Sequence, residues 1–335
     1  MIRNLDMQDH PTSAATGAAA LQGGLACRAF SRAAMVALLA AIPWGGSLAI
    51  RAAETGEPRT LTYVVEKSLN LVPSGPPDSA EAPWVAHLLM NARSLPHNED
   101  GRVVARFPRG TALTGSYIRI VESDEEWLEI EHEGKPAYIA RIGLTRPHPA
   151  NLAVIAQHGN LPIGEEIVSR WWGMPIAYEP DDMVEIDAGY CLDPQPPNAD
   201  RSEGGKFLLR AEAAESLAAM LDEMQAAGVP VFVSSAYRSG ATQRRLYLSA
   251  TRRRAAQRGT APPGHSEHQL ATTVDFSTEK AERRSLRNTD EAFEWLAAHA
   301  ARFGWHQTYR ADNRELTGYI EEPWHWRYMG AAVGP

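Results

Sequence analysis

The spacing of apolar residues changes along the chain, and this change constrains the fold more than any other feature. In residues 61–145, short alternations of apolar and polar residues lie between turn residues, which predicts antiparallel strands. In residues 208–228, apolar residues recur at helical spacing, which predicts an amphipathic helix. Residues 146–149 (RPHP) contain two prolines and are typical of a boundary between domains. The sequence therefore predicts an α+β protein, with a small β domain at residues 59–147 and a mixed α+β domain at residues 150–332.

A β-hairpin is predicted at the end of the first region. In residues 127–131 (WLEIE), two apolar residues alternate with Glu129 and Glu131, so we expect one face of the strand to contact water. Residues 132–135 (HEGK) supply a turn, and residues 138–142 (YIARI) are the expected partner strand.

The order of turns and strands before this hairpin is also informative. A strand at residues 90–93 leads to a turn at residues 108–111, and a further strand leads to Trp127. This order resembles the bacterial SH3-like domains that accompany cell-wall hydrolases. The resemblance implies a small antiparallel β-barrel, which either binds peptidoglycan or serves as a spacer.

The second region mixes helices and strands. A second helix is predicted at residues 290–303, with Asn288 or Thr289 as its N-cap and Gly304 as its stop. Strands are predicted at residues 229–235, 305–309 and 318–321. This mixture favours an α+β domain with a central antiparallel sheet over a doubly wound parallel sheet.

The amino-terminal residues are typical of a targeting segment. Arg28 and Arg32 precede an uncharged run at residues 33–50, which is the charge order of a secretory signal, and small residues favour cleavage after Ala49. We expect residues 1–58 to be a signal or anchor with its leader, and the protein to be exported to the periplasm or cell envelope. An uncleaved membrane anchor and a buried core helix are the alternatives.

Composition limits which partners and which metal ligands are expected. The chain has 33 Lys and Arg against 41 Asp and Glu, a net charge of −8, so no nucleic-acid partner is expected. Its two cysteines, Cys27 and Cys191, are too few for a four-cysteine zinc site, and any metal must use His and carboxylate ligands. Once the leader is removed, Cys191 is expected to be a small buried side chain.

Three motifs contain the residues expected to perform chemistry. The first is SAYRS at residues 235–239, followed by Gln243. The second is PGHSEH at residues 263–268, with Asp275 seven residues later. The third is EPWHWRY at residues 322–328.

These motifs hold the groups that a hydrolytic zinc site requires. Such a site takes three protein ligands and leaves one position open for water, and His268, Asp275 and His325 would supply the three. Glu322 is placed to take a proton from the activated water. Arg238 is placed to stabilise negative charge on the attacked carbonyl oxygen.

Each residue also has an ordinary structural explanation. In a chain with eleven histidines, a His with an Asp seven residues later arises by chance. Glu322 could be a solvated acid and Arg238 a surface ion-pair partner. The occurrence of all three motifs in order within residues 235–328 favours the catalytic interpretation.

Residues 162–330 resemble the VanY-type D-alanyl-D-alanine carboxypeptidases, zinc peptidases of the bacterial cell wall. The likeness rests on YEPDDMVEI, SAYRS with its glutamine, PPGHSEHQ, VDF and GYIEEPWHWRYMG. The family usually has glycine and a small residue where this chain has Ala271 and Thr273, so we expect the pocket shape to differ.

The resemblance implies a role for each site residue. It implies that Zn²⁺ is held by His268, Asp275 and His325, that Glu322 is the catalytic acid and base, and that Arg238 contacts the substrate or the oxyanion. It further implies that the substrate pocket is shaped by Ser266, Gln243 and Tyr237.

Residues 236–260 contain seven arginines and no acidic residue. This composition predicts either a solvated helix face or a positive field that attracts carboxylate-rich stem peptides.

The sequence thus predicts a zinc-dependent D-alanyl-D-alanine carboxypeptidase acting on peptidoglycan stem peptides. An L,D-carboxypeptidase, a D,D-dipeptidase or a D,D-endopeptidase on the same scaffold is the enzymatic alternative. A non-catalytic, zinc-stabilised cell-wall-binding protein is the alternative from another class.

Overall fold

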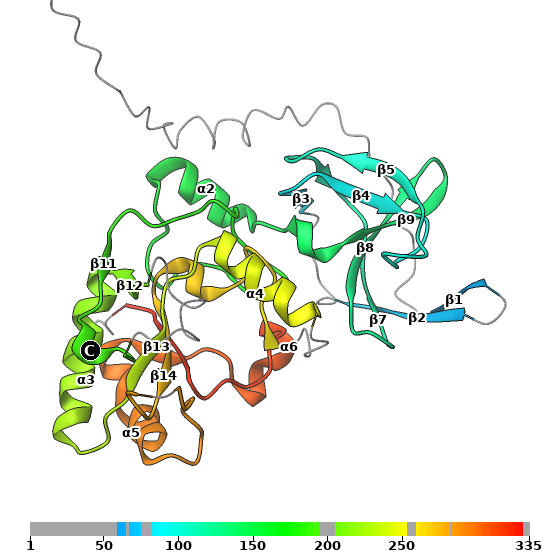
Figure 1. Cartoon of the computed structure of the whole chain (residues 1–335). Helices are drawn as coiled ribbons and strands as arrows, with labels where there is room; N and C mark the ends of the chain where they lie inside the picture. Colours follow the sequence, from blue (N-terminus) through cyan, green and yellow to red (C-terminus); the bar gives the residue numbers. More distant parts are fainter. Residues whose placement is uncertain are drawn as a thin grey trace, which may run out of the picture.

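The computed structural model describes residues 59–64, 67–74, 82–193, 205–252, 259–281 and 283–330. The apolar run at residues 33–50, the predicted leader and Cys27 lie outside these residues. Within the described ranges, no helix combines the length and apolar character needed to cross a membrane. Figure 1 shows a β-rich region, mostly cyan, beside a region of helices and strands coloured from green to red.

The β-rich region consists of short antiparallel strands, as the alternation predicts. They are β1 (Arg59–Val64), β2 (Lys67–Pro73), β3 (Trp84–Ala86), β4 (Met90–Arg93), β5 (Val103–Phe107), β6 (Ala112–Leu113), β7 (Ser116–Ile120), β8 (Glu126–His132), β9 (Lys135–Ala140) and β10 (Leu144–Thr145). One sheet has the order β1-β2-β7-β8-β9-β4-β5, and a smaller sheet has the order β10-β3-β6. Among the described strands β1 and β5 do not pair, so the sheet is open and the predicted SH3-like barrel is not confirmed.

The predicted hairpin forms between β8 and β9. Its turn residues Glu133 and Gly134 have φ of 53° and 73°, the positive values that a tight two-residue turn requires. The prediction that Glu129 contacts water is wrong, because its side chain is 1% exposed. Apolar clusters form on both faces of the sheet, one around Leu128 and one around Trp127. Alternation within one strand does not reveal this second packed layer.

The second region has a four-stranded antiparallel sheet in the order β13-β14-β16-β15, which agrees with the predicted α+β class. Its helices and strands are α2 (Pro149–His158), β11 (Met183–Glu185), β12 (Leu208–Arg210), α3 (Ala211–Ala226), β13 (Phe232–Ser235), α4 (Gly240–Arg252), β14 (Thr273–Ser277), α5 (Glu291–His299), β15 (Trp305–Gln307), α6 (Arg314–Thr317) and β16 (His325–Tyr328). Short 3₁₀ helices are η1 (Arg141–Gly143), η2 (Ala188–Tyr190), η5 (Glu267–Leu270), η6 (Ala300–Phe303) and η7 (Ala311–Asn313).

Helix α3 is the predicted amphipathic helix, and it packs against the core of the second region. The residues at helical spacing are all buried: Leu217, Met220, Leu221 and Met224. The helix begins at Ala211, because residues 208–210 pair with β11 as strand β12. Cys191 is buried in the same core, as expected.

Helix α5 is the second predicted helix, and it passes into η6 before ending. Asp290 occupies its N-cap position in place of Asn288 or Thr289. Gly304 ends η6 with φ of 80°, a left-handed conformation common after helices. The strand predicted at residues 318–321 does not form, and that segment is a loop.

The two regions contact each other through buried side chains. Glu126 of β8 accepts hydrogen bonds from Arg170 at 2.9 and 2.6 Å, and both side chains are 3% exposed. Trp84 of β3 stacks on His265 with ring centroids 6.2 Å apart. The β-rich region therefore packs against the segment that leads into η5.

Candidate metal centre

Three elements bring residues of the second and third motifs together. His268 lies in η5, Asp275 in β14 and His325 at the start of β16. Strands β14 and β16 are antiparallel, with Asp275 paired directly to His325. Ala271 ends η5 with φ of 55°, a left-handed conformation that turns the chain toward β14. The fold thus joins two side chains that are 50 positions apart in the sequence.

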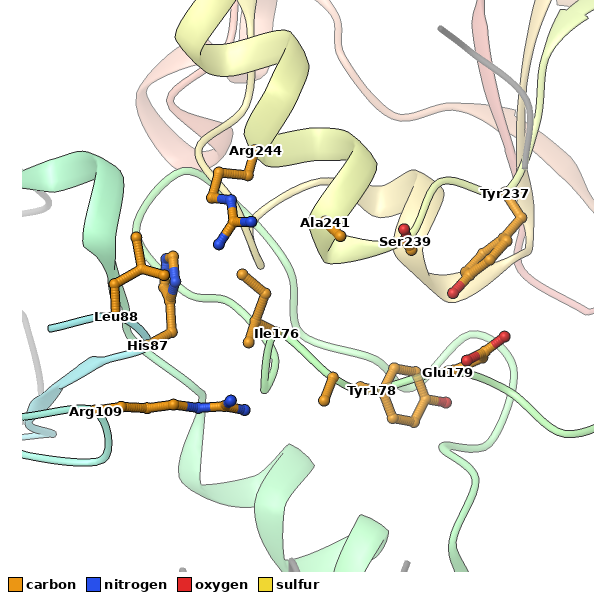
Figure 2. A pocket seen from close by; sticks show the side chains of 11 residues that line it. His87, Leu88, Arg109, Ile176, Tyr178, Glu179, Tyr237, Ser239, Ala241 and Arg244 are labelled. Atoms are coloured by element: carbon orange, nitrogen blue, oxygen red, sulfur yellow. The ribbon is translucent and has the colours of Figure 1, made fainter. Parts of the chain in front are cut away.

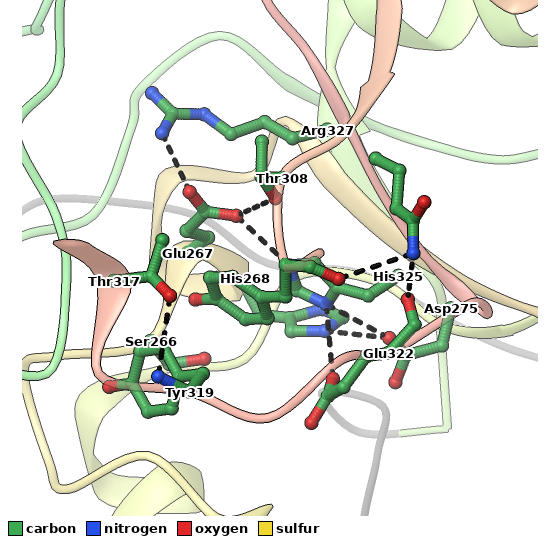
Figure 3. A network of polar contacts seen from close by, with 12 residues as sticks. Ser266, Glu267, His268, Asp275, Thr308, Thr317, Tyr319, Glu322, His325 and Arg327 are labelled. Carbon is green, nitrogen blue, oxygen red and sulfur yellow. Dashed lines mark hydrogen bonds and ion pairs between the residues drawn. The ribbon is translucent and has the colours of Figure 1, made fainter. Parts of the chain in front are cut away.

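The three side chains converge on one point (Figure 3). Asp275 Oδ1 lies 3.2 Å from Nε2 of His268 and 3.2 Å from Nδ1 of His325. One ligand atom from each residue lies within 4.8 Å of the other two, and all three side chains are buried. Atoms at these separations can share one ion at bond lengths of about 2.0–2.2 Å.

The far nitrogen of each histidine is held by a second group. Nδ1 of His268 is 2.7 Å from the carbonyl oxygen of Ala236, which can only accept, so this nitrogen donates. Nε2 of His325 donates to Glu267 Oε2 at 2.9 Å. These contacts leave the other nitrogen of each ring directed at Asp275, where an ion would lie.

Glu267 is itself fixed by several donors. Arg327 donates to its Oε1 at 2.9 Å and Thr308 to its Oε2 at 2.6 Å. Arg327 also donates to Glu166 Oε2 at 2.7 Å. Burial would raise the pKa of Glu267, but the charge of Arg327 and the hydrogen bond from His325 lower it to about 2. Glu267 is therefore a fixed anion behind His325.

Burial and neighbouring charges shift the pKa of each of the three converging residues. Burial lowers the pKa of His268 to about 4, and the charge of Arg238 acts in the same direction. Burial would raise the pKa of Asp275, but its histidine partners hold it well below the usual range. Burial would lower the pKa of His325, but hydrogen bonds to Asp275 and Glu267 raise it to about 9. The carboxylate pair around His325 thus provides the negative charge that a divalent ion would neutralise.

Glu322 lies beside the converging atoms. Its Oε2 is 3.7 Å from Nδ1 of His325, and its side chain is 13% exposed. The backbone nitrogen of His325 donates to the Glu322 carbonyl at 3.0 Å, and that of Glu322 donates to the Tyr309 carbonyl at 3.1 Å. The ring of Tyr309 stacks on His325 with centroids 4.2 Å apart. These contacts hold the Glu322 carboxylate near the ion position while keeping it accessible to water.

A cavity of about 150 Å³ opens onto these side chains. It is also lined by Arg238, Ser266 and Gln243. Arg238 Nη2 donates to Ser266 Oγ at 3.5 Å, and Gln243 Nε2 donates to the Ala261 carbonyl at 2.6 Å. The structure therefore brings seven of the eight predicted site residues to one cavity.

Tyr237 lies in a different place. Its side chain is 2% exposed and lines a second cavity, of about 370 Å³ (Figure 2). Ser239 lines that second cavity as well, whereas Arg238 between them lines the cavity that holds His268 and Asp275. Successive side chains of this segment thus point to opposite sides, and the predicted placement of Tyr237 beside the other site residues is not seen.

The sequence prediction missed the residues that support the ligands. Glu267, Thr308 and Arg327 form the hydrogen-bonded group behind His325, and Tyr309 packs against its ring. The only available signal was position, since Glu267 precedes His268 and Arg327 shares a strand with His325.

The side chains present fit a divalent ion of the zinc type. Two imidazoles and one carboxylate are an accepted donor set, and three protein ligands leave a coordination position open for water. A carboxylate beside that position and a guanidinium that lines the same cavity are the groups that hydrolysis by an activated water uses.

Comparison with known proteins finds a family that is similar to part of the second region. Residues 206–331 match the family model described as VanY, D-alanyl-D-alanine carboxypeptidase. This segment is therefore similar to VanY-family domains. All eight predicted site residues lie within it, and the β-rich region lies outside it.

Two curated proteins match part of the chain. The protein YodJ of Bacillus subtilis (strain 168) is 30% identical over 173 residues, which are 49% of this chain and 59% of YodJ. A D-alanyl-D-alanine carboxypeptidase of Enterococcus faecalis is 34% identical over 124 residues, 33% of this chain and 44% of that protein. The chain therefore spans less than two thirds of either relative.

A solved structure of the LdcB LD-carboxypeptidase is also similar. It has 26% sequence identity and a TM-score of 0.42, and the match covers 50% of this chain and 76% of that one.

Proposed function

We propose that this protein is a zinc-dependent D-alanyl-D-alanine carboxypeptidase that removes a terminal D-alanine from peptidoglycan stem peptides. The observation that carries this proposal is the convergence of His268, Asp275 and His325 beside Glu322 within a segment similar to VanY-family domains. The name of the Enterococcus faecalis relative supports the choice of substrate.

Each residue of the site has a separate role in hydrolysis. When bound, the ion polarises the scissile carbonyl and lowers the pKa of a water to about 7. Glu322 takes the proton from that water and delivers it to the leaving amine. Arg238 provides a fixed positive charge as the carbonyl oxygen becomes negative. Glu267 keeps the His325 ring oriented throughout.

Ser266 and Gln243 are proposed to bind the peptide. Both line the cavity of about 150 Å³ beside His268 and His325, called the metal-facing cavity below, and both are buried. The side-chain oxygen of Gln243 has no hydrogen-bond partner among the described residues, so it is available to a peptide N–H group. The depth of this part of the cavity would decide between a terminal D-alanine, a dipeptide and a cross-link.

We further propose that the protein is exported to the periplasm or cell envelope. The proposal rests on the basic residues that precede the apolar run at residues 33–50 and on the extracytoplasmic position of peptidoglycan. Amino-terminal sequencing of the secreted protein tests it, with a mature terminus after Ala49 as the expected result.

Muropeptide mass analysis tests the activity. The zinc-loaded protein is incubated with purified muropeptides, alone, with a chelator, and with zinc restored after chelation. We expect the loss of one alanine, its abolition by the chelator and its return with zinc. Loss of a dipeptide or cleavage of cross-links would replace the proposed specificity with another.

The matched control is His268→Ala, which removes one ligand and is expected to lose both the ion and the activity. Unchanged masses with fully zinc-loaded protein would overturn the enzymatic proposal and favour a non-catalytic wall-binding protein.

A further inference from the structure

The second cavity, of about 370 Å³, lies between the two regions and takes part in no step above. The β-rich region contributes His87, Leu88 and Arg109 to its lining. The second region contributes the loop around Tyr178 and the first turns of α4. Its volume falls in the range of about 300–1,000 Å³ typical of small-ligand sites.

One end of this cavity is positively charged. The side chain of His87 is 6% exposed, and neither ring nitrogen has a hydrogen-bond partner in the described part of the chain. Arg109 and Arg244 likewise form no ion pair with any described residue. Figure 2 shows both arginine side chains extending into the cavity beside His87. A buried polar group without a partner is costly, and a ligand that pairs with it removes that cost.

The imidazole of His87 is neutral at neutral pH. Burial lowers its pKa to about 4, and the positive charges of Arg141, Arg244 and Arg109 contribute in the same direction. A neutral imidazole offers one N–H donor and one acceptor. The imidazole of His87 therefore provides a neutral hydrogen-bond donor beside the two positively charged arginines.

The opposite end of the cavity has a negatively charged residue, Glu179. Figure 2 shows Glu179 beyond the ring of Tyr178, away from the two arginines. Ile176 lies between the two ends, and it is partly buried. This order of positive, apolar and negative groups matches a short peptide with a carboxylate at one end and an amino group at the other.

We propose that this cavity is a second peptide-binding site, in which Arg109 and Arg244 hold a free carboxylate and Glu179 holds an amino group. A guanidinium presents paired donors that match the two oxygens of a carboxylate. The peptide class is an uncross-linked stem peptide, and this choice of source rests on the proposed function. The preference for a carboxylate rests only on the side chains of the cavity.

The site shares structural elements with the metal centre. Ala241 and Arg244 of α4 line the second cavity, whereas Gln243 and Leu246 of the same helix line the metal-facing cavity. Tyr237 in the second cavity directly precedes Arg238, whose backbone nitrogen donates to the His268 carbonyl at 3.1 Å. An occupant of the second cavity thus contacts the same segment that positions Arg238.

Isothermal titration of the zinc-loaded full chain tests the proposal. The probes are the tripeptide L-Ala-γ-D-Glu-L-Lys, which has no terminal D-alanine to be cleaved, and the same peptide with both carboxylates amidated. We expect the acid form to bind at least tenfold more tightly. The double variant R109Q/R244Q is expected to remove this preference, and the single variant R109Q, at an exposed position, to reduce it.

The matched control is the double variant R106Q/R245Q, which removes the same charge from exposed positions outside both cavities. It is expected to keep the affinity for the acid peptide within twofold. Equal binding of the two probes, or equal weakening in test and control variants, would overturn the site. Hydrolysis of a pentapeptide ending in D-Ala-D-Ala is measured separately, so its absence would refute the proposed function without affecting the binding result.

Discussion

His325 shows how strongly one side chain of the candidate metal centre depends on its neighbours. One ring nitrogen is 3.2 Å from Asp275 and the other is 2.9 Å from Glu267. Its face packs on Tyr309, and Glu322 lies 3.7 Å from the nitrogen that faces Asp275. Both ring nitrogens and one ring face thus have partners, so a change in any of these neighbours is expected to alter how an ion is held or used.

Replacement of Glu322 separates catalysis from metal binding. Glu322→Gln keeps the shape of the side chain but removes the base, so we expect full zinc occupancy and a fall in kcat of about 10²–10⁴-fold. Metal content by mass spectrometry and turnover of a D-Ala-D-Ala peptide measure the two effects. The neighbouring substitution Glu321→Gln lies outside the cavity lining and serves as the control. Normal turnover by Glu322→Gln would remove this residue from the mechanism.

Replacement of Glu267 tests the group behind the histidine. Glu267→Gln retains the size of the side chain but loses the charge that pairs with Arg327 and orients His325. We expect zinc affinity to fall about 10–100-fold, measured by competition with a chelating dye. Glu291→Gln, at an exposed position in α5, should leave affinity unchanged. An unaltered zinc affinity in Glu267→Gln would show that the carboxylate has no orienting role.

At the scale of elements, α3 carries much of the core of the second region. Leu217 is fully buried, with 0% exposure. Leu217→Ala is expected to lower the free energy of unfolding by about 2–5 kcal/mol, because it removes buried methyl groups and leaves a cavity. Chemical denaturation followed by circular dichroism measures the loss.

The control for this change is Leu316→Ala in α6, where the side chain is 77% exposed and the expected change is within about 0.5 kcal/mol. Similar losses from both substitutions would contradict the assignment of Leu217 to the core.

Element prediction from the sequence succeeded where a pattern was long and failed where it was short. Helix α3 has 16 residues, enough for its apolar spacing to be read directly. Strand β12 has only three, and it forms by pairing with β11, a contact that no local pattern encodes. The burial of Glu129 was missed for the same reason, because the layer that covers it comes from other strands.

The residues of the candidate site were likewise predicted only in part from the sequence. The motifs placed His268, Asp275 and His325 in order, and the pairing of β14 with β16 brings the last two together. The supporting role of Glu267 and the position of Tyr237 depend on which side of the backbone each side chain occupies. That choice is made by tertiary packing, and the spacing of motif residues does not contain it.

At the scale of the whole molecule, the β-rich region packs against the segment before η5 and supports its position. Trp84 stacks on His265, and Arg170 lies under the ring of Tyr319 with its guanidinium 5.8 Å from the ring centroid. Tyr319 in turn donates to the His265 carbonyl at 2.8 Å and lines the metal-facing cavity. The division of the chain near residues 146–149 remains a prediction, but these contacts show that the two regions share buried side chains.

The pair of Glu126 and Arg170 tests this connection. Both side chains are 3% exposed, so removing one charge leaves the other buried without its partner. Glu126→Leu is expected to lower the free energy of unfolding by about 3–5 kcal/mol, and Arg170→Met by a similar amount. The double variant replaces the pair with apolar side chains, and we expect it to recover most of the loss, because no unpaired charge remains.

A double-mutant cycle by chemical denaturation measures this recovery, and zinc affinity is measured on the same four proteins. If the β-rich region braces the metal centre, the single variants should weaken zinc binding as well as stability, since Arg170 supports Tyr319 beside the cavity. Additive losses in the cycle would mean that the two charges act independently. Weaker stability with unchanged zinc affinity would mean that the contact joins the regions without positioning the metal ligands.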